Sequence, residues 1–289
     1  MNEIALLKVF PLKSMIMKTY ISFTLILLLA ACSTIEIRES DAFDAHQTVT
    51  PNNFQFEQYT LHSISLETDD GEKLDSWFLE HENPAATVLY FGGNGFLMLK
   101  SKPLIQAYSN IPVNLMLFDY RGYGLSSGQP TVAGIHKDAK AAFDFARNQT
   151  ISSTEKLFIH GHSMGSFLSA STAYEQEISG YVMESPITEV TDWTRNFVPR
   201  LLRPFIRFDI DDALANESNL GKISQINTPL LLISGSSDEI TPSSMAEKLE
   251  KNSASEEKTL VIIEGGNHNN LPTFQQYRNA LISFYGLSD

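Results

Sequence analysis

The sequence predicts an α/β protein with a mostly parallel, doubly wound sheet flanked by helices. From residue 54 onward, short continuous apolar runs alternate with segments whose apolar residues recur every three or four positions. One of these runs ends in a Gly-x-Ser-x-Gly turn at residues 161–165. Strand and helix patterns that alternate along one chain are typical of a parallel sheet with helical crossovers.

The expected strands begin with a hairpin. Residues 59–68 alternate between apolar and polar side chains, Asp69-Asp70-Gly71 predicts a turn, and residues 74–79 return as the second strand. Later runs are continuously apolar, which is typical of strands buried on both faces. These buried strands are expected at 86–91, 113–119, 157–160, 180–183, 229–234 and 259–264.

Helical periodicity is clearest over residues 131–147, where the apolar side chains share one face. A small-residue helix is expected at 166–174, a helix opened by Thr-Pro at 242–249, and a terminal helix at 274–284. These units follow one another closely. They predict one domain over residues 54–289.

The turn Gly161-His162-Ser163-Met164-Gly165 follows the strand at 157–160 and is interpreted as a nucleophile elbow. A serine in such a strand-to-helix turn has a strained backbone and an exposed hydroxyl. Glycine is needed on both sides because a larger side chain would collide with neighbouring backbone. The alternative is an ordinary glycine-rich turn.

A serine nucleophile needs a histidine base and a carboxylate that orients it, in the chain order Ser, Asp or Glu, His for this type of fold. His268 is the only histidine after Ser163, and Asp238 lies one strand-helix unit before it. Both follow strands, where loops at the carboxyl edge of the sheet can meet. The alternatives are a surface histidine, a turn aspartate, and Glu184 as the acid.

Negative charge that develops on a substrate carbonyl requires two backbone N–H donors. The elbow offers the N–H of Met164. The glycine-rich loop at 92–95 offers a second donor, which we assign to Asn94. The alternative is a plain flexible loop; a P-loop is excluded because no Lys-Ser/Thr follows the glycines.

Four motifs, at 119–126 (DYRGYGLS), 161–165 (GHSMG), 235–242 (GSSDEITP) and 265–268 (GGNH), together resemble the α/β-hydrolase superfamily. They are most similar to its small-lid serine hydrolases, related to the prolyl-oligopeptidase and serine-aminopeptidase-like group. The resemblance covers residues 74–287 and implies an α/β-hydrolase fold with a short lid and no cofactor. It implies these roles: Ser163 as nucleophile, Asp238 as acid, His268 as base, and Met164 and Asn94 as oxyanion donors.

The chain departs from the family pattern in the oxyanion loop, where relatives often carry His-Gly and this sequence has Gly92-Gly93. The DYRGYG segment implies structural support beside the site rather than chemistry.

The lid is expected at about residues 186–227, and it is rich in apolar side chains and in arginines. The apolar residues form a roof over an acyl pocket or pack against the core. Two interpretations of the arginines are open. They bind lipid headgroups or an anionic substrate, or they belong to a solvated face and bind nothing. The apolar set is Trp193, Phe197, Val198, Leu201, Leu202, Phe205, Ile206 and Phe208, and the basic set is Arg195, Arg200, Arg203 and Arg207.

The amino-terminal 31 residues predict a signal peptide. Residues 19–31 are apolar and follow Lys18, and this run is shorter than the roughly 20 residues of a membrane-spanning helix. Leu29-Ala30-Ala31-Cys32 resembles the lipobox of bacterial lipoproteins, which implies cleavage before Cys32 and its acylation. The alternatives are a simple cleaved signal and an uncleaved anchor. Polar residues 32–53 predict a flexible tether.

Ser33 after the cysteine resembles the sorting pattern for the outer membrane of Gram-negative bacteria. A lipid-anchored protein of the cell envelope, facing the periplasm, is therefore expected. Cys32 is the only cysteine, so an intrachain disulfide is impossible.

The formal net charge is −13, and removal of residues 1–31 leaves 18 basic and 33 acidic residues. This acidity argues against nucleic acid as a partner and against electrostatic binding to anionic lipid. We expect a serine hydrolase that cleaves small carboxylic esters through an acyl-enzyme, in the manner of a carboxylesterase or lipase. The alternatives are a peptidase, thioesterase or acyltransferase with the same triad, or a non-catalytic envelope-binding lipoprotein.

Overall fold

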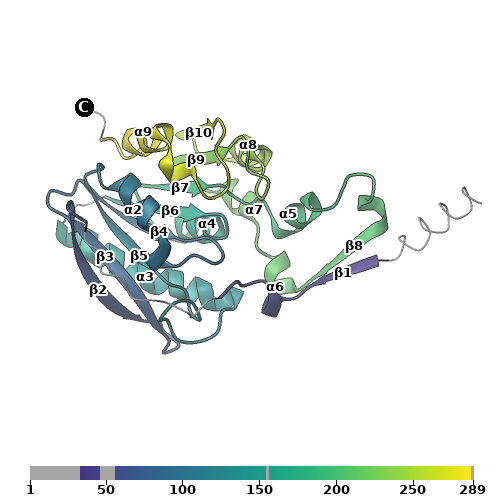
Figure 1. Cartoon of the computed structure of the whole chain (residues 1–289), viewed down its shortest axis with the longest axis horizontal. Coiled ribbons are helices and arrows are strands. Elements are labelled where there is room, and N and C mark those ends of the chain that lie inside the picture. Colours follow the sequence, from purple (N-terminus) through teal and green to yellow (C-terminus); the bar gives the residue numbers. More distant parts are fainter. Residues whose placement is uncertain (1–32, 46–55, 154–155, 288–289) are drawn as a thin grey trace, which may run out of the picture.

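A computed structural model describes residues 33–45, 56–153 and 156–287. The strands of its central sheet are β2 (Tyr59–Glu67), β3 (Lys73–His81), β4 (Ala86–Phe91), β5 (Val113–Phe118), β6 (Leu157–His162), β7 (Gly180–Glu184), β9 (Leu230–Gly235) and β10 (Lys258–Ile263). Their order is β10-β9-β7-β6-β4-β5-β3-β2 (Figure 1). β2, β3 and β5 are antiparallel neighbours, and the remaining pairs are parallel. The predicted hairpin followed by a parallel sheet is confirmed.

Helices cover both faces of this sheet. Every residue of β4, β5 and β9 is buried, as expected for strands that are covered on both sides. Side chains of the helices pack with the strands into two separate apolar clusters. One face carries α3 (Val132–Ser153), α4 (Gly165–Glu175), α7 (Asn219–Ile223) and α8 (Ser243–Asn252), and the other carries α2 (Lys102–Tyr108) and α9 (Gln275–Phe284).

The segment between β5 and α3 carries the DYRGYG motif, and Arg121 anchors it. The Arg121 side chain is buried and donates to Asp138 Oδ1 of α3 at 2.8 Å and to both carboxylate oxygens of Asp70 at 3.0 and 3.1 Å. The β2–β3 turn, the motif and α3 are thereby joined. The hydrogen bond from Arg121, with others from Thr68 and Lys137, holds the pKa of Asp70 well below its usual range.

A second, two-stranded sheet extends from the domain as an arm (Figure 1). It consists of β1 (Ser33–Ile37) and β8 (Ile206–Ile210), which run parallel in a register that pairs Ser33 with Ile206 and Ile37 with Ile210. Arg38 stabilises the base of the arm through ion pairs with Asp209 and Asp211.

The arm differs from the tether expected over residues 32–53. The described part of the expected tether is residues 33–45. These residues form β1 and then lie along the domain. Alternating isoleucines at 35 and 37 give β1 one apolar face, and that face allows it to pair with the apolar residues of β8. Residues 46–53 lie outside the described part.

The lid contains α5 (Val190–Asn196), η3 (Arg203–Phe205), β8 and α6 (Asp212–Ala215). Trp193 lines the cavity described below and Val198 is buried. Phe197, Leu201 and Leu202 are exposed, so these three residues neither roof the cavity nor pack against the core, which were the two expectations for the apolar residues of the lid. No helix in the described ranges combines the length and apolar character needed to span a bilayer.

Candidate active site

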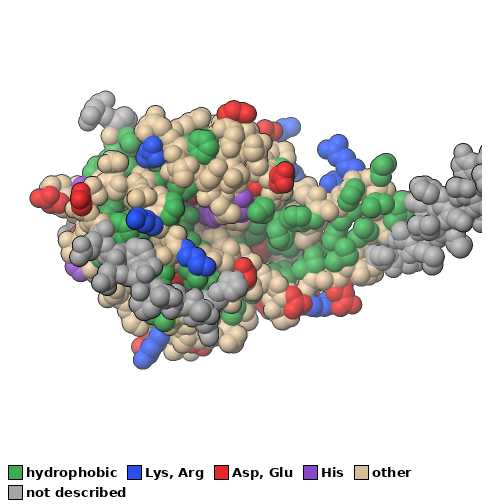
Figure 2. All heavy atoms as spheres, viewed as in Figure 1, with side chains coloured by type: hydrophobic (Ala, Val, Ile, Leu, Met, Phe, Trp, Pro, Cys, Tyr) green, Lys and Arg blue, Asp and Glu red, His purple; other side chains and the backbone are tan. Residues whose placement is uncertain are grey.

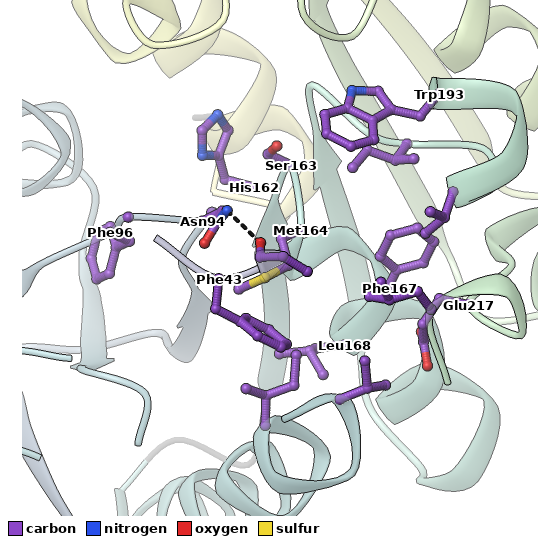
Figure 3. A pocket seen from close by; sticks show the side chains of 18 of the residues that line it. Phe43, Asn94, Phe96, His162, Ser163, Met164, Phe167, Leu168, Trp193 and Glu217 are labelled. Atoms are coloured by element: carbon purple, nitrogen blue, oxygen red, sulfur yellow. Dashed lines mark hydrogen bonds between the residues drawn. The ribbon is translucent and has the colours of Figure 1, made fainter. Parts of the chain in front are cut away.

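A cavity of about 650 Å³ lies where the carboxyl ends of the central strands face the lid and the amino-terminal segment. Ser163 and His162 line it together with mostly apolar side chains (Figure 3). His268 also lines it. Phe43 contributes from the amino-terminal segment, and Trp193 contributes from α5. The cavity therefore joins the predicted reactive serine to an apolar chamber.

The elbow has the geometry that the sequence predicts. Ser163 has a φ of +52°, a left-handed conformation that non-glycine residues rarely adopt. A Cβ on Gly161 would lie 2.1 Å from the carbonyl oxygen of Gly165, and one on Gly165 would lie 2.1 Å from that of Phe91. Both glycines are required because β6, α4 and β4 approach each other so closely.

The structure brings Ser163, His268 and Asp238 into one hydrogen-bonded row. His268 Nε2 lies 3.0 Å from Ser163 Oγ, and His268 Nδ1 lies 2.9 Å from Asp238 Oδ2. The carboxylate accepts the Nδ1–H, which leaves the Nε2 lone pair to accept the serine hydroxyl proton. All three residues are buried. The arrangement suits removal of a proton from a serine nucleophile.

Asp238 is held by the turn that follows it. Its Oδ1 accepts the N–H groups of Ile240 and Thr241 at 2.9 and 2.8 Å, and its Oδ2 accepts the Thr241 hydroxyl at 2.9 Å. Burial raises the pKa of Asp238, but the hydrogen bonds from His268 and Thr241 outweigh burial and hold it below its usual value. Asp238 thus caps its own turn and also pairs with His268. The sequence analysis gave these two roles as alternatives, and the structure shows that one residue fills both.

Thr241 is a site residue that the sequence analysis missed. Its Oγ1 also lies 3.0 Å from His268 Nδ1, and its side chain is buried. The spacing Asp-x-x-Thr before a helix-opening proline carries this signal in the sequence, because it is typical of an aspartate that caps its own turn.

Thr241→Val is expected to lower kcat on an ester substrate about tenfold, because Asp238 loses one charge-assisted hydrogen bond that orients it toward His268. Thr241→Ser keeps the hydroxyl and serves as the matched control, with kcat close to that of the wild type. Steady-state kinetics and thermal unfolding of both variants test this positioning role. Equal losses of kcat in the two variants would contradict it.

His162 is a second residue that the sequence analysis did not assign. Its Nε2 donates to the backbone carbonyl of His268 at 2.9 Å, and the two rings lie 4.9 Å apart. Burial lowers the pKa of His162, so the ring is neutral at pH 7. The bond ties the loop that carries His268 to the end of β6.

The expected oxyanion donors lie on either side of the serine. A Cβ on Gly93 would lie 3.3 Å from Ser163 Cβ, so the loop at 92–95 runs directly against the serine. In the described part of the chain, neither the Met164 N–H nor the Asn94 N–H donates to a protein acceptor. Both N–H groups remain candidates for a substrate oxygen.

The side chain of Asn94 connects the loop at 92–95 by hydrogen bonds to the DYRGYG motif and to the amino-terminal segment. Its Oδ1 accepts the Tyr123 hydroxyl at 2.7 Å and the Asp44 N–H at 2.8 Å. Its Nδ2 donates to the carbonyl of Ala42 at 2.9 Å, the bond that is dashed in Figure 3. Tyr123 of the motif thus supports the loop at 92–95, in line with the supporting role that the resemblance implied.

The amino-terminal segment forms one wall of the cavity, which the predicted tether did not anticipate. Ile37, Ala42 and Phe43 line the cavity. Glu39 Oε1 accepts the N–H of Val132 at 2.6 Å, where negative charge is favourable at the start of α3.

The structure does not bring Glu184 to His268. The Glu184 side chain is buried beneath the site, where Tyr277 donates to its Oε2 at 3.0 Å and His160 Nε2 lies 3.0 Å away. Glu184 as the acid is therefore wrong for this structure. Within the described residues, no group of three or more His, Cys, Asp or Glu side chains is placed to hold a metal ion. Cys32 lies outside the described part.

Comparisons with known proteins show the superfamily to which this chain belongs. The model of the family described as serine aminopeptidase, S33, matches residues 82–210. The uncharacterized protein YfhR of Salmonella typhi is 30% identical over 244 residues, an alignment that covers 77% of this chain and 80% of YfhR. This chain belongs to the α/β-hydrolase superfamily.

Two solved structures show the same fold. An esterase of Pyrococcus furiosus has a TM-score of 0.68 at 19% identity, with 85% of this chain and 97% of the esterase covered. A soluble variant of monoglyceride lipase from Saccharomyces cerevisiae has a TM-score of 0.63 at 17% identity, with 81% and 96% covered. The superfamily assignment supports a hydrolase.

Proposed function

We propose that this protein is a serine esterase that cleaves carboxylic esters through an acyl-enzyme. The observation that carries the proposal is the row Asp238–His268–Ser163, which ends at the wall of an apolar cavity. Metal ions and organic cofactors are not needed for this reaction, because the three side chains supply nucleophile, base and orientation.

In the proposed reaction, Ser163 Oγ attacks the ester carbonyl carbon while its proton passes to His268 Nε2. The N–H groups of Met164 and Asn94 are the proposed donors to the resulting oxyanion. When the carbon–oxygen ester bond breaks, His268 gives the proton to the leaving alcohol. A water molecule, deprotonated by His268, then attacks the acyl-enzyme, releases the carboxylic acid and restores the serine.

The cavity favours an apolar acyl group. Phe43, Met164, Phe167, Leu168 and Trp193 line it beside Ser163 (Figure 3). Side chains of this kind stabilise hydrocarbon chains by removing them from water. Its volume of about 650 Å³ is large enough for a short or medium acyl chain together with a small alcohol.

An aminopeptidase is the less favoured function, because such an enzyme needs a free carboxylate to bind the substrate ammonium group. Two carboxylates line the cavity. That of Asp41 is exposed to water on the amino-terminal segment, whereas that of Glu217 has His136 Nε2 at 2.9 Å from its Oε1 and Lys222 Nζ at 3.5 Å from its Oε2, so that only Glu217 offers a buried carboxylate. Burial raises the pKa of Glu217, but these two partners hold it below its usual value. Its negative charge is already compensated.

A substrate panel on the full chain tests the proposed function. We expect kcat/KM on p-nitrophenyl esters from butyrate to decanoate to exceed that on aminoacyl amides and acyl-CoA thioesters at least about 100-fold, a difference of roughly 2.7 kcal/mol in transition-state binding. Faster cleavage of the amides or thioesters would assign one of the alternative activities. A folded chain that resists a fluorophosphonate probe would instead support a non-catalytic binding protein.

We further propose that Cys32 is acylated and that the mature protein faces the periplasm on the outer membrane. The lipobox-like sequence before Cys32 supports this, and two or more acyl chains hold a protein on a bilayer stably. Mass spectrometry of the amino-terminal peptide from a bacterial host is expected to show an acylated Cys32. An unmodified cysteine or an intact residue 1–31 segment would contradict the proposal.

A further inference from the structure

The tip of the arm exposes large apolar side chains to water. The tip comprises residues 195–207, which are the end of α5, the segment that follows it and the start of β8. The exposed fraction is 87% for Leu201, 58% for Phe197 and 39% for Leu202. Apolar side chains that are grouped in this way on a surface mark a contact with another apolar phase. The segment between α5 and β8 lies at the projecting end of the arm, and the surface of the arm carries many hydrophobic side chains (Figures 1 and 2).

The same tip is basic, although the whole chain has a net charge of −13. Arg195, Arg200 and Arg207 are exposed and Arg203 is half-buried. In the described residues, none of the four forms an ion pair with a carboxylate. The nearby carboxylates of Glu36, Asp209 and Asp211 share the one cation Arg38 and lie toward the domain end of β1 and β8, away from Ser33 and Ile206. Distant acidic residues are screened beyond about 10 Å at moderate salt, so the tip has a local positive field.

The register of the arm places the start of β1 at this tip. Ser33 pairs with Ile206, directly after η3, whereas Ile37 pairs with Ile210 at the domain. The chain therefore enters the described structure at the end of the arm that carries the exposed leucines. Cys32 and the apolar run at 19–31 immediately precede this point in the sequence. An opposite orientation of β1 would have separated the two features.

We propose that the tip of the arm is a bilayer-docking surface, with Leu201, Leu202 and Phe197 in the interfacial acyl region and the four arginines on anionic headgroups. An apolar tip flanked by cations matches the chemistry of an anionic membrane surface. β1 ends at Ile37, which lines the cavity, and five strand residues span roughly 15 Å. Docking thereby sets the distance between the bilayer and Ser163.

Site-specific fluorescence tests the insertion. The full chain carries Cys32→Ser, which removes its only cysteine. Two variants then each add one new cysteine, Leu201→Cys or Leu125→Cys. An environment-sensitive nitrobenzoxadiazole label is attached to that cysteine. Leu125 is the matched control, because it is a leucine with 69% exposure outside the arm. Both proteins are mixed with vesicles of phosphatidylcholine and phosphatidylglycerol.

We expect a blue-shifted emission and quenching by nitroxide-labelled lipid at position 201, and neither at position 125. A label at 201 that stays in water while the protein sediments with the vesicles would overturn the proposal. Failure of the protein to sediment with them would overturn it as well.

Charge reversal tests the arginines. Arg200→Glu/Arg207→Glu is expected to lower partition into the anionic vesicles at least about tenfold, since each basic residue near such a surface contributes about fivefold. Lys100→Glu/Lys251→Glu makes the same charge change at two exposed lysines outside the lid, with an expected effect below about twofold. Equal effects of the two pairs would overturn the role of the arginines.

The docking proposal and the esterase proposal can be tested independently of each other. Hydrolysis of a water-soluble p-nitrophenyl ester is expected to stay at the wild-type rate in the charge-reversal variant. Loss of vesicle binding with unchanged hydrolysis supports docking, whereas absence of hydrolysis in the wild type contradicts the esterase proposal alone.

Discussion

Ser163→Ala is expected to lower kcat on p-nitrophenyl esters by a factor of about 10⁴ to 10⁶ and to abolish labelling by a fluorophosphonate probe. The variant loses the only oxygen within hydrogen-bond distance of His268 Nε2 in the described structure. Only substrate binding and the oxyanion donors would then promote attack by water. Steady-state kinetics and gel-based labelling measure the two effects.

Ser171→Ala is the matched control. Ser171 is a buried serine of α4, eight positions after Ser163. Its substitution by alanine also removes a serine Oγ. We expect this variant to retain labelling and turnover. Full activity in Ser163→Ala would refute the assigned nucleophile, and a lost thermal transition would show that the variant failed to fold rather than to react.

Arg121→Met is expected to lower the free energy of unfolding by about 3–5 kcal/mol, because it leaves the buried carboxylate of Asp138 without its counter-charge. Asp138 has 0% exposure, and Arg121 donates to it through both its side chain and its backbone N–H. Methionine preserves much of the apolar stem, so the lost charge dominates the effect. Urea unfolding at pH 7 measures it.

Lys140→Met is the control for this prediction. Lys140 pairs with Asp144 on the exposed surface of the same helix, where such a pair contributes only about 0.3–0.5 kcal/mol. Similar losses in the two variants would contradict the burial argument.

The loss in Arg121→Met should also depend on pH. Burial raises the pKa of Asp138 even beside Arg121, and removal of the guanidinium raises it further. A carboxyl with a raised pKa in the folded state destabilises the fold as pH rises above its unfolded value near 4. The deficit should therefore be largest at neutral pH and should shrink toward pH 4, where Asp138 is protonated.

Much of the active site was predictable because local backbone constraints restrict the sequence there. Gly161 and Gly165 must be glycine since a Cβ would lie 2.1 Å from a neighbouring carbonyl oxygen. The turns after β9 and β10 lie at the same edge of a parallel sheet as the elbow, so their positions in the chain predicted that Asp238 and His268 could reach Ser163. Glu184 also follows a strand, but its side chain points into the buried cluster with Tyr277. Only tertiary packing showed that Asp238, and not Glu184, is the carboxylate that contacts His268.

The amino acid sequence by itself determined a hairpin followed by buried strands and crossover helices, the turn that carries Ser163, and the two residues that meet this serine. These features depend on hydrophobic periodicity and on glycines at close backbone contacts, which are local properties. The tertiary structure decided that residues 33–45 form an arm and a cavity wall, and that Leu201 and its neighbours face water. Those outcomes depend on the pairing of β1 with a segment about 170 residues away, which no local pattern specifies.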